Sequence, residues 1–275
     1  MAALYALCAA LVFGAGDFLG GFASRRVPVL VVILVSQLAG LLGILVWLGA
    51  AHEHVPPAGD LLAAAGAGTT GLIGLVALYR GLSLGLMAIV APVSALSPLI
   101  ALAADVINGK APGPSDLLGI ALVLTGLVVL SLEPDGNTPF AAGIGLALIA
   151  AVGFGLYAVG IDAGSDESTI WAVSVARGTA ATLAFVAVLA ARAPVGRVRG
   201  ALTLVLGVGL FDTLGNVFLA TATTHGLISI VDALAAGYPV VTVTLAMLVL
   251  HERPGARRVL AGLTAIGGAV MVAVG

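Results

Sequence analysis

The sequence predicts an all-α integral membrane protein in which ten transmembrane helices form two inverted repeats of five helices each. Its composition is far from that of a soluble domain. Hydrophobic residues make up 61% of the 275 residues and charged residues only 9%, against roughly 25% charged residues in soluble domains. Apolar runs near the ~20 residues needed to cross the hydrocarbon core recur along the whole chain. The expected surroundings are therefore a lipid bilayer, and no basic run suggests a nucleic-acid partner.

An internal repeat predicts how the helices are arranged. Residues 61–100 align without a gap on residues 202–241, at a constant offset of 141, with twelve identities in forty positions. Composition alone would make about an eighth of the aligned positions identical, so an internal repeat is the better interpretation. Pro98 pairs with Pro239, and the same offset carries Phe13-Gly14 onto Phe154-Gly155. The repeat therefore spans most of each half.

Turn-forming and charged segments divide the chain into spans. The ten spans cover residues 4–23, 28–49, 61–80, 86–107, 116–132, 141–161, 169–191, 201–222, 226–249 and 257–274. The first has no basic start and no cleavage site, so we expect a structural helix and not a signal peptide. Since each half has an odd number of spans, the second half enters from the opposite side, as in folds with a substrate site near the midplane. The predicted repeats are residues 1–133 and 140–275, joined by a linker at 134–139.

Basic residues predict the orientation in the membrane. The predicted loops on the same side of the membrane as the N-terminus carry a single basic residue, Lys110. Those on the opposite face carry nine arginines: Arg25, Arg26, Arg80, Arg192, Arg197, Arg199, Arg253, Arg257 and Arg258. The positive-inside rule makes the arginine face cytoplasmic. We therefore expect a multi-pass protein of the inner (cell) membrane with both termini extracytoplasmic.

Four ionisable residues lie well inside predicted spans, namely Asp17, Arg177, Asp212 and Asp232. At roughly 2.5 to 3.5 kcal/mol each, they oppose insertion by about 10 kcal/mol together. Mutual pairing, for instance of Arg177 with Asp212, would explain part of this cost structurally. One arginine does not neutralise three acids, so the aspartates are also candidates for binding a solute or a proton. Arg177 is likewise a candidate binding residue, since it would hold the carboxylate of a zwitterion such as an amino acid.

The surroundings of each acid suggest a role. Asp17 lies between Gly16 and Gly20, which allow close helix contact, so it either faces a cavity as a proton- or cation-binding carboxylate or braces a neighbouring helix. Asp212 and Asn216 are four residues apart and share one helix face, where they either hold an ammonium or hydroxyl group or join two helices. Asp232 precedes Tyr238-Pro239 by two turns.

Prolines and tyrosines complete the candidate residues. Pro98 and Pro239 are expected to kink matched helices, either as hinges of a moving carrier or as static bends that improve packing. Tyr79, Tyr157 and Tyr238 are candidate cavity-lining residues because a buried hydroxyl needs a partner. The four histidines lie in or next to loops without metal-ligand spacing, so we expect no metal site and no cofactor.

The chain resembles the EamA family of the drug/metabolite transporter superfamily. The resemblance is carried by the Phe-Gly pair of the first helix in each half, by ALYRGLSLGLMAIVAPVSALSP, and by ATATTHGLISIVDALAAGYP through HERPGARRVLAG near the C-terminus. Glu252, Arg253 and Gly262 match the family's ending, and the first half lacks the glutamate. The resemblance implies a ten-helix carrier of amino acids, metabolites or drugs, commonly coupled to protons. Asp17 also resembles the acidic position in the first helix of small drug antiporters.

Together these features predict a secondary active transporter, proton-coupled and directed to efflux, of a small polar or amphipathic solute such as an amino acid or amine. Alternating access would take place at a central cavity between the repeats. A non-transporting scaffold or receptor is one alternative. The other is an intramembrane aspartyl protease, because residues 14–17 read Gly-Ala-Gly-Asp; two carboxylates sharing a proton would then activate water. We favour the transporter, without catalytic residues, since the protease does not explain the repeat.

Overall fold

A computed structural model of the chain describes all residues except 85–89, 91, 92, 111, 132–139, 251–255 and 275. The described residues form helices joined by turns and contain no strand, which confirms the all-helical prediction. The helices are α1 (Ala2–Ser24), α2 (Val29–Ala51), α3 (Ala58–Ser83), α5 (Pro98–Ile107), α6 (Pro114–Ser131), α7 (Phe140–Gly164), α8 (Thr169–Ala190), the 3-10 helix η1 (Val195–Ala201), α9 (Leu202–Thr223), α10 (Ile228–Ala235), α11 (Tyr238–Leu250) and α12 (Ala256–Val274).

Among the described residues, 6 helical segments are long and apolar enough to cross a membrane. They are Ala2–Ser24, Val29–Ala51, Ala58–Ser83, Gly143–Gly164, Thr169–Ala190 and Val195–Thr223. Shorter apolar helical segments cover Pro98–Ile107, Pro114–Gly126, Ile228–Thr242 and Leu260–Val272. Many large apolar side chains on the outside of the bundle are exposed, among them Leu42 and Leu62. This arrangement is typical of helices that face lipid, and the chain is a multi-pass membrane protein.

The structure corrects the prediction that Pro239 kinks one long helix over residues 226–249. In that segment α10 ends at Ala235, a turn follows, and α11 begins at Tyr238 with Pro239 in its first turn. Likewise Pro98 is the first residue of α5 and not an interior residue of a described helix. Both positions suit proline because the first turn of a helix does not use the missing N–H group. The predicted linker at 134–139 lies outside the described residues, as do Glu252 and Arg253.

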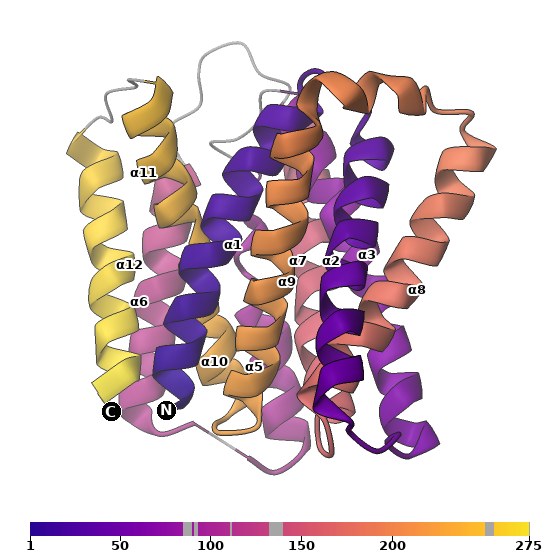
Figure 1. Ribbon diagram of the computed structural model, residues 1–275. Helices are drawn as coiled ribbons and strands as arrows, with labels where there is room; N and C mark the ends of the chain where they lie inside the picture. The colour runs from indigo at the N-terminus through magenta and orange to yellow at the C-terminus, as the bar shows by residue number, and fades with distance from the viewer. Residues whose placement is uncertain (85–89, 91–92, 111, 132–139, 251–255, 275) are drawn as a thin grey trace.

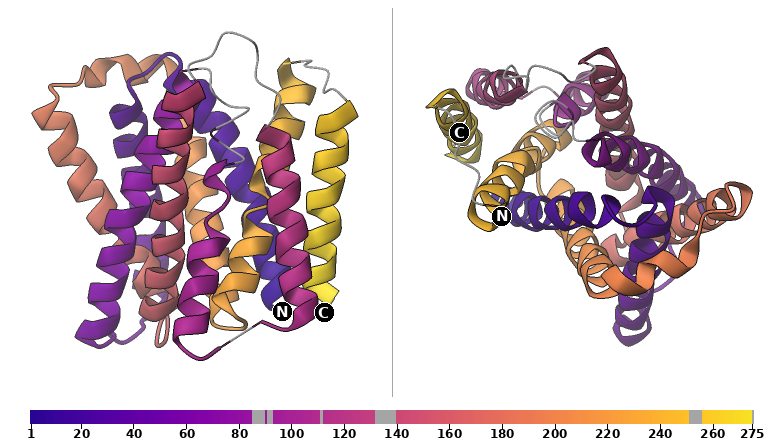
Figure 2. Two further views of the ribbon diagram at one scale, coloured as in Figure 1. Left: turned by 180° about the vertical axis from the view of Figure 1, so that it is seen from behind. Right: turned by 90° about the horizontal axis from the view of Figure 1, so that it is seen from above.

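The helices form one bundle with both chain ends at the same end (Figure 1). Helix α1 packs chiefly against α9, α3 against α7, and α2 against α8, while α6 and α12 lie side by side at one edge (Figure 2). Small residues permit these contacts. A Cβ atom on Gly74 would lie 2.9 Å from the Phe154 ring, and one on Gly215 would lie 2.5 Å from the Phe13 ring. Helices α3 and α7 are therefore in close contact, and so are α1 and α9.

Candidate functional site

A cavity of about 820 Å³, open solvent at its mouth included, lies among the helices. Most of its lining residues stand near the middle of α1, α2, α3, α7, α8 and α9, and the others lie in or beside the short helices α5, α10 and α11. The lining residues are Phe13, Asp17, Gln37, Gly68, Gly71, Leu72, Leu75, Ser97, Phe154, Tyr157, Ala176, Arg177, Ala180, Asp212, Asn216, Leu219, Asp232, Ala235, Ala236 and Tyr238. The cavity is therefore central in the bundle.

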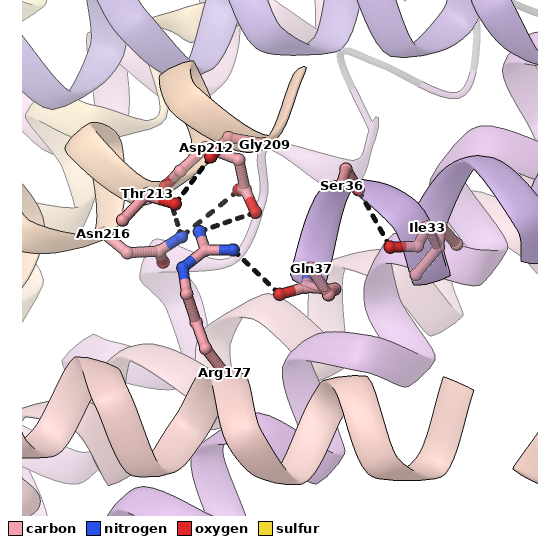
Figure 3. A network of polar contacts seen from close by, with 8 residues as sticks. All are labelled: Ile33, Ser36, Gln37, Arg177, Gly209, Asp212, Thr213 and Asn216. Atoms are coloured by element: carbon pink, nitrogen blue, oxygen red, sulfur yellow. Dashed lines mark hydrogen bonds and ion pairs between the residues drawn. The ribbon is translucent and has the colours of Figure 1, made fainter. Parts of the chain in front are cut away.

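An ion pair between α8 and α9 forms one wall of the cavity (Figure 3). Nη2 of Arg177 lies 2.8 Å from Oδ2 of Asp212. Nη1 of Arg177 donates to Oε1 of Gln37 on α2, also at 2.8 Å. The Arg177 residue is only 3% exposed, so its charge depends on these two partners. The pairing of Arg177 with Asp212, considered from the sequence as a structural possibility, is present.

Asn216 completes this polar wall from the next turn of α9. Its Nδ2 donates to the backbone oxygen of Asp212 at 2.6 Å and to Oδ1 of Asp212 at 3.2 Å. The two side chains thus share one helix face, as their spacing predicts. Room for the guanidinium comes from Gly40 on α2, where a Cβ atom would lie 2.8 Å from Nη1 of Arg177. Contacts from α2, α8 and α9 therefore fix the position of this polar wall, which consists of Arg177, Gln37, Asp212 and Asn216.

Asp17 lines the cavity from α1 and is half-buried. Within the described part of the chain, its carboxylate takes part in no hydrogen bond or ion pair. Helix α1 nevertheless contacts α9 at this level, because a Cβ atom on Gly16 would lie 3.6 Å from the backbone nitrogen of Asp212, within van der Waals contact. Asp17 is thus held beside the ion pair, and its carboxyl group stays available to a solute.

Asp232 lines the cavity from α10 and is more deeply buried, with 6% of its surface exposed. The Ser97 hydroxyl, just before α5, forms a hydrogen bond with its carboxyl group. The other oxygen, Oδ2, is buried and has no hydrogen-bond partner among the described residues. Asp232 therefore links α10 to the start of α5, and its Oδ2 atom has no partner among the described residues.

The three candidate tyrosines divide between the cavity and the core. Tyr157 and Tyr238 line the cavity, and the Tyr238 hydroxyl lies 2.7 Å from the Ser94 hydroxyl. Gly71 makes room for Tyr157, since a Cβ atom there would lie 2.7 Å from its ring. Tyr79 does not line the cavity; it is 1% exposed and packs against Gly20 in the main hydrophobic core.

The charges of the cavity do not balance. Arg177 is neutralised by Asp212, which leaves the carboxyl groups of Asp17 and Asp232 without a cationic partner among the described residues. Four aromatic rings, those of Phe13, Phe154, Tyr157 and Tyr238, complete the lining. Carboxylates and aromatic faces together attract a cationic group in a site shielded from water. The arrangement therefore suits an amine better than a carboxylate.

Sequence reasoning missed three polar residues that organise this region. Gln37 binds Arg177, Ser97 binds Asp232, and Asp105 on α5 is 1% exposed and accepts a hydrogen bond from the backbone nitrogen of Ser229 at 2.8 Å. Asp105 thereby caps the N-terminus of α10, where a negative charge is favoured. An amide inside the apolar run VVILVSQLAG was the available signal for Gln37. The partners of Asp105 and Ser97 are distant in sequence and gave no local signal.

Comparisons with known proteins agree with this architecture. A crystal structure of a protein described in no further detail is similar to the chain, with a TM-score of 0.80 and 19% sequence identity over 99% of this chain and 96% of the other. At that identity the likeness shows the fold alone. Among curated proteins, none matches the sequence. The sequence profile of the EamA-like transporter family matches residues 1–132 and again residues 141–274. These two matches cover nearly the whole chain, and the protein therefore belongs to the EamA-like transporter family.

Proposed function

We propose that the protein is a proton-coupled secondary transporter that exports a small amphipathic solute with an amine group, such as an amine or an amino acid. The observation that carries the proposal is the central cavity in which Asp17 and Asp232 lack a cationic partner among the side chains that the structure describes, while Arg177 is already paired. Buried charges inside a membrane protein are costly and mark solute or ion pathways. A solute amine would supply the missing positive charge.

Alternating access between two inverted repeats is the proposed mechanism, and matched contacts support it. A Cβ atom on Gly14 would lie 2.7 Å from the backbone oxygen of Tyr238 and 2.5 Å from Val241. At the positions 141 residues away, a Cβ atom on Gly155 would lie 2.9 Å from the backbone oxygen of Ser97 and 2.5 Å from Ile100. The first helix of each half thus packs on the start of a short helix in the other half. Equivalent contacts of this kind allow two equivalent conformations, one open to each side.

The helix starts at Pro98 and Pro239 are the proposed hinges. Each proline follows a turn that interrupts the helical backbone, at 95–97 and at 236–237. A turn can absorb a change in backbone angles that a continuous helix resists. Both turns reach the cavity, since Ser97, Ala236 and Tyr238 line it. A hinge there would couple solute binding to movement of α5 and α11.

The proposed orientation places the arginine-bearing end of the bundle in the cytoplasm of a cell with an inner membrane. The 25–28 turn and η1 lie at the end opposite the chain termini (Figure 1). Their arginines include Arg25, Arg26, Arg197 and Arg199. By the positive-inside rule this end is cytoplasmic. Export is proposed on the resemblance to carriers of the drug/metabolite superfamily.

An aspartyl protease is disfavoured by the same geometry. Such chemistry needs two carboxyl groups that share a proton. Asp212, the acid on the helix packed beside Asp17, is instead engaged by Arg177 and Asn216. A non-transporting scaffold would have no use for central-cavity acids that lack a cationic partner among the described residues. The transporter therefore explains more of the observed arrangement than either alternative.

Solute-driven proton flux tests the proposal. Purified protein in liposomes loaded with a pH-sensitive dye would be challenged with a panel of amines, amino acids, sugars and organic anions. We expect an amine-dependent proton flux that Asp17→Asn abolishes and Glu167→Gln, a change at an exposed connection, leaves intact. Flux driven only by organic anions, or unchanged in Asp17→Asn, would contradict the assignment of the cavity.

A further inference from the structure

Asp17 and Asp232 line one cavity, but the protein surrounds them differently. Asp17 is half-buried and faces open space. Asp232 is 6% exposed and is held by the Ser97 hydroxyl, and its Oδ2 atom is buried without a partner in the described part of the chain. An ionised carboxylate is stabilised in a buried site only by several donors or a cation. A single hydroxyl donor favours the neutral acid, whose O–H group needs no cation.

Charged and titratable groups on every helix packed against α10 set this environment. Asp105 of α5 lies at the far end of α10 and caps its N-terminus. Asp212 is paired with Arg177, so the two together add no net charge near α10. Among the side chains that the structure describes, the remaining titratable groups on these helices and on the adjoining α11 are Tyr5, Cys8 and Asp17 of α1, Asp116 in the first turn of α6, Tyr157 and Asp162 of α7, and Tyr238 of α11.

We propose a division of labour between the two acids: Asp232 carries the coupling proton, and Asp17 receives the amine of the solute. The inference rests on the proposed function and assigns separate roles within that one cavity. Asp17 is reachable by a solute because it is the less buried group. A proton can bind to Asp232 although this residue is more deeply buried, because a proton occupies almost no space.

The two acids communicate through the cavity. A cationic amine bound beside Asp17 makes the electrostatic potential at Asp232 more positive, and this effect is strong where water is excluded. The O–H bond of Asp232 then breaks, its proton passes to water on the side to which the cavity is open, and the carboxylate remains. When the amine leaves on the other side, Asp232 takes up a proton from that side. One cation is exchanged for one proton, so no net charge crosses the membrane.

Infrared difference spectroscopy tests the protonation of Asp232 without any solute. The full-length protein in lipid would be compared with Asp232→Asn and Asp17→Asn at neutral pH, using the carbonyl stretching band of a protonated carboxylic acid. We expect the band in the wild type and in Asp17→Asn and its loss in Asp232→Asn. Loss in Asp17→Asn with retention in Asp232→Asn would overturn the assignment. Should Asp232→Asn fail to fold, Ser97→Ala decides, because removal of the hydroxyl must shift the band if it belongs to Asp232.

A second measurement separates this inference from the proposed function. Tyramine, a primary aromatic amine that matches the acidic and aromatic lining, would be added to weakly buffered protein with a pH indicator. We expect the wild type to bind tyramine and release a proton, Asp232→Asn to bind without proton release, and Asp17→Asn to lose binding. Proton release that persists in Asp232→Asn would refute the division of labour. An absence of tyramine binding in the wild type would count against the amine-binding cavity alone, because the infrared band reports Asp232 independently.

Discussion

Replacing Asp212 by asparagine is expected to be one of the most destabilising single changes in the polar wall. The substitution keeps the size of the side chain but leaves Arg177, 3% exposed, as an uncompensated buried cation. Breaking a buried pair in this way costs about 3 to 5 kcal/mol. Because the new amide oxygen and Gln37 can still accept from the guanidinium, we expect about 3 kcal/mol, or about a 150-fold larger unfolding constant.

Removing the other partner of the ion pair, Arg177, should cost less stability than removing the charge of Asp212, and this difference can be measured. The Asp212 side chain is 18% exposed against 4% for that of Arg177, so Arg177→Met leaves an acid that reaches the water of the cavity. We expect Arg177→Met to cost about 1.5 to 3 kcal/mol, the value of a hydrogen bond to a charged group. The double variant should recover most of the loss of Asp212→Asn, because no unpaired charge remains.

Unfolding of the purified protein by a denaturing detergent in mixed micelles, followed by tryptophan fluorescence, would measure these differences. Asp166→Asn is the matched control, since Asp166 is exposed in the connection between α7 and α8. If Asp212→Asn were as stable as this control, or if the double variant were less stable than Asp212→Asn, the ion pair would not be the interaction that fixes the polar wall.

Three further changes can be measured in the same titration. Gly14→Ala should destabilise the protein by about 1 to 3 kcal/mol, because its Cβ atom would lie 2.5 Å from a side-chain carbon of α11. Gly43→Ala should not destabilise it, since nothing lies within 4 Å of a Cβ atom at that position. Equal stabilities of these two variants would argue against a tight contact between α1 and α11. Asp105→Ala should cost about 1 to 3 kcal/mol by leaving the buried N–H of Ser229 without an acceptor, and an unchanged midpoint would refute the cap. Gln37→Leu should cost about 1.5 to 3 kcal/mol because Arg177 loses a charged hydrogen bond, and no loss would mean that Asp212 alone suffices.

The amino-acid sequence determined the class of the protein and most of its helices. Apolar runs of membrane-spanning length depend only on local composition, so they can be recognised without any knowledge of the partners of each helix. The face shared by Asp212 and Asn216 follows from helix geometry alone, and the structure has it. The cost of burying charge identified Asp17, Arg177 and Asp232 as unusual, and all three line the cavity.

Only the tertiary structure decided how these residues combine. The pairing of Arg177 with Asp212 and Gln37 joins three helices that are far apart in the chain, and no local pattern encodes such contacts. From the sequence, Tyr79 and Tyr157 were equal candidates for lining the cavity, but the packing of α3 places Tyr79 in the hydrophobic core. Proline suits both a kink and a first turn, so the sequence left the break before Pro239 undecided. Packing between distant helices resolved each of these choices, because it alone determines which side chains meet and which face open space.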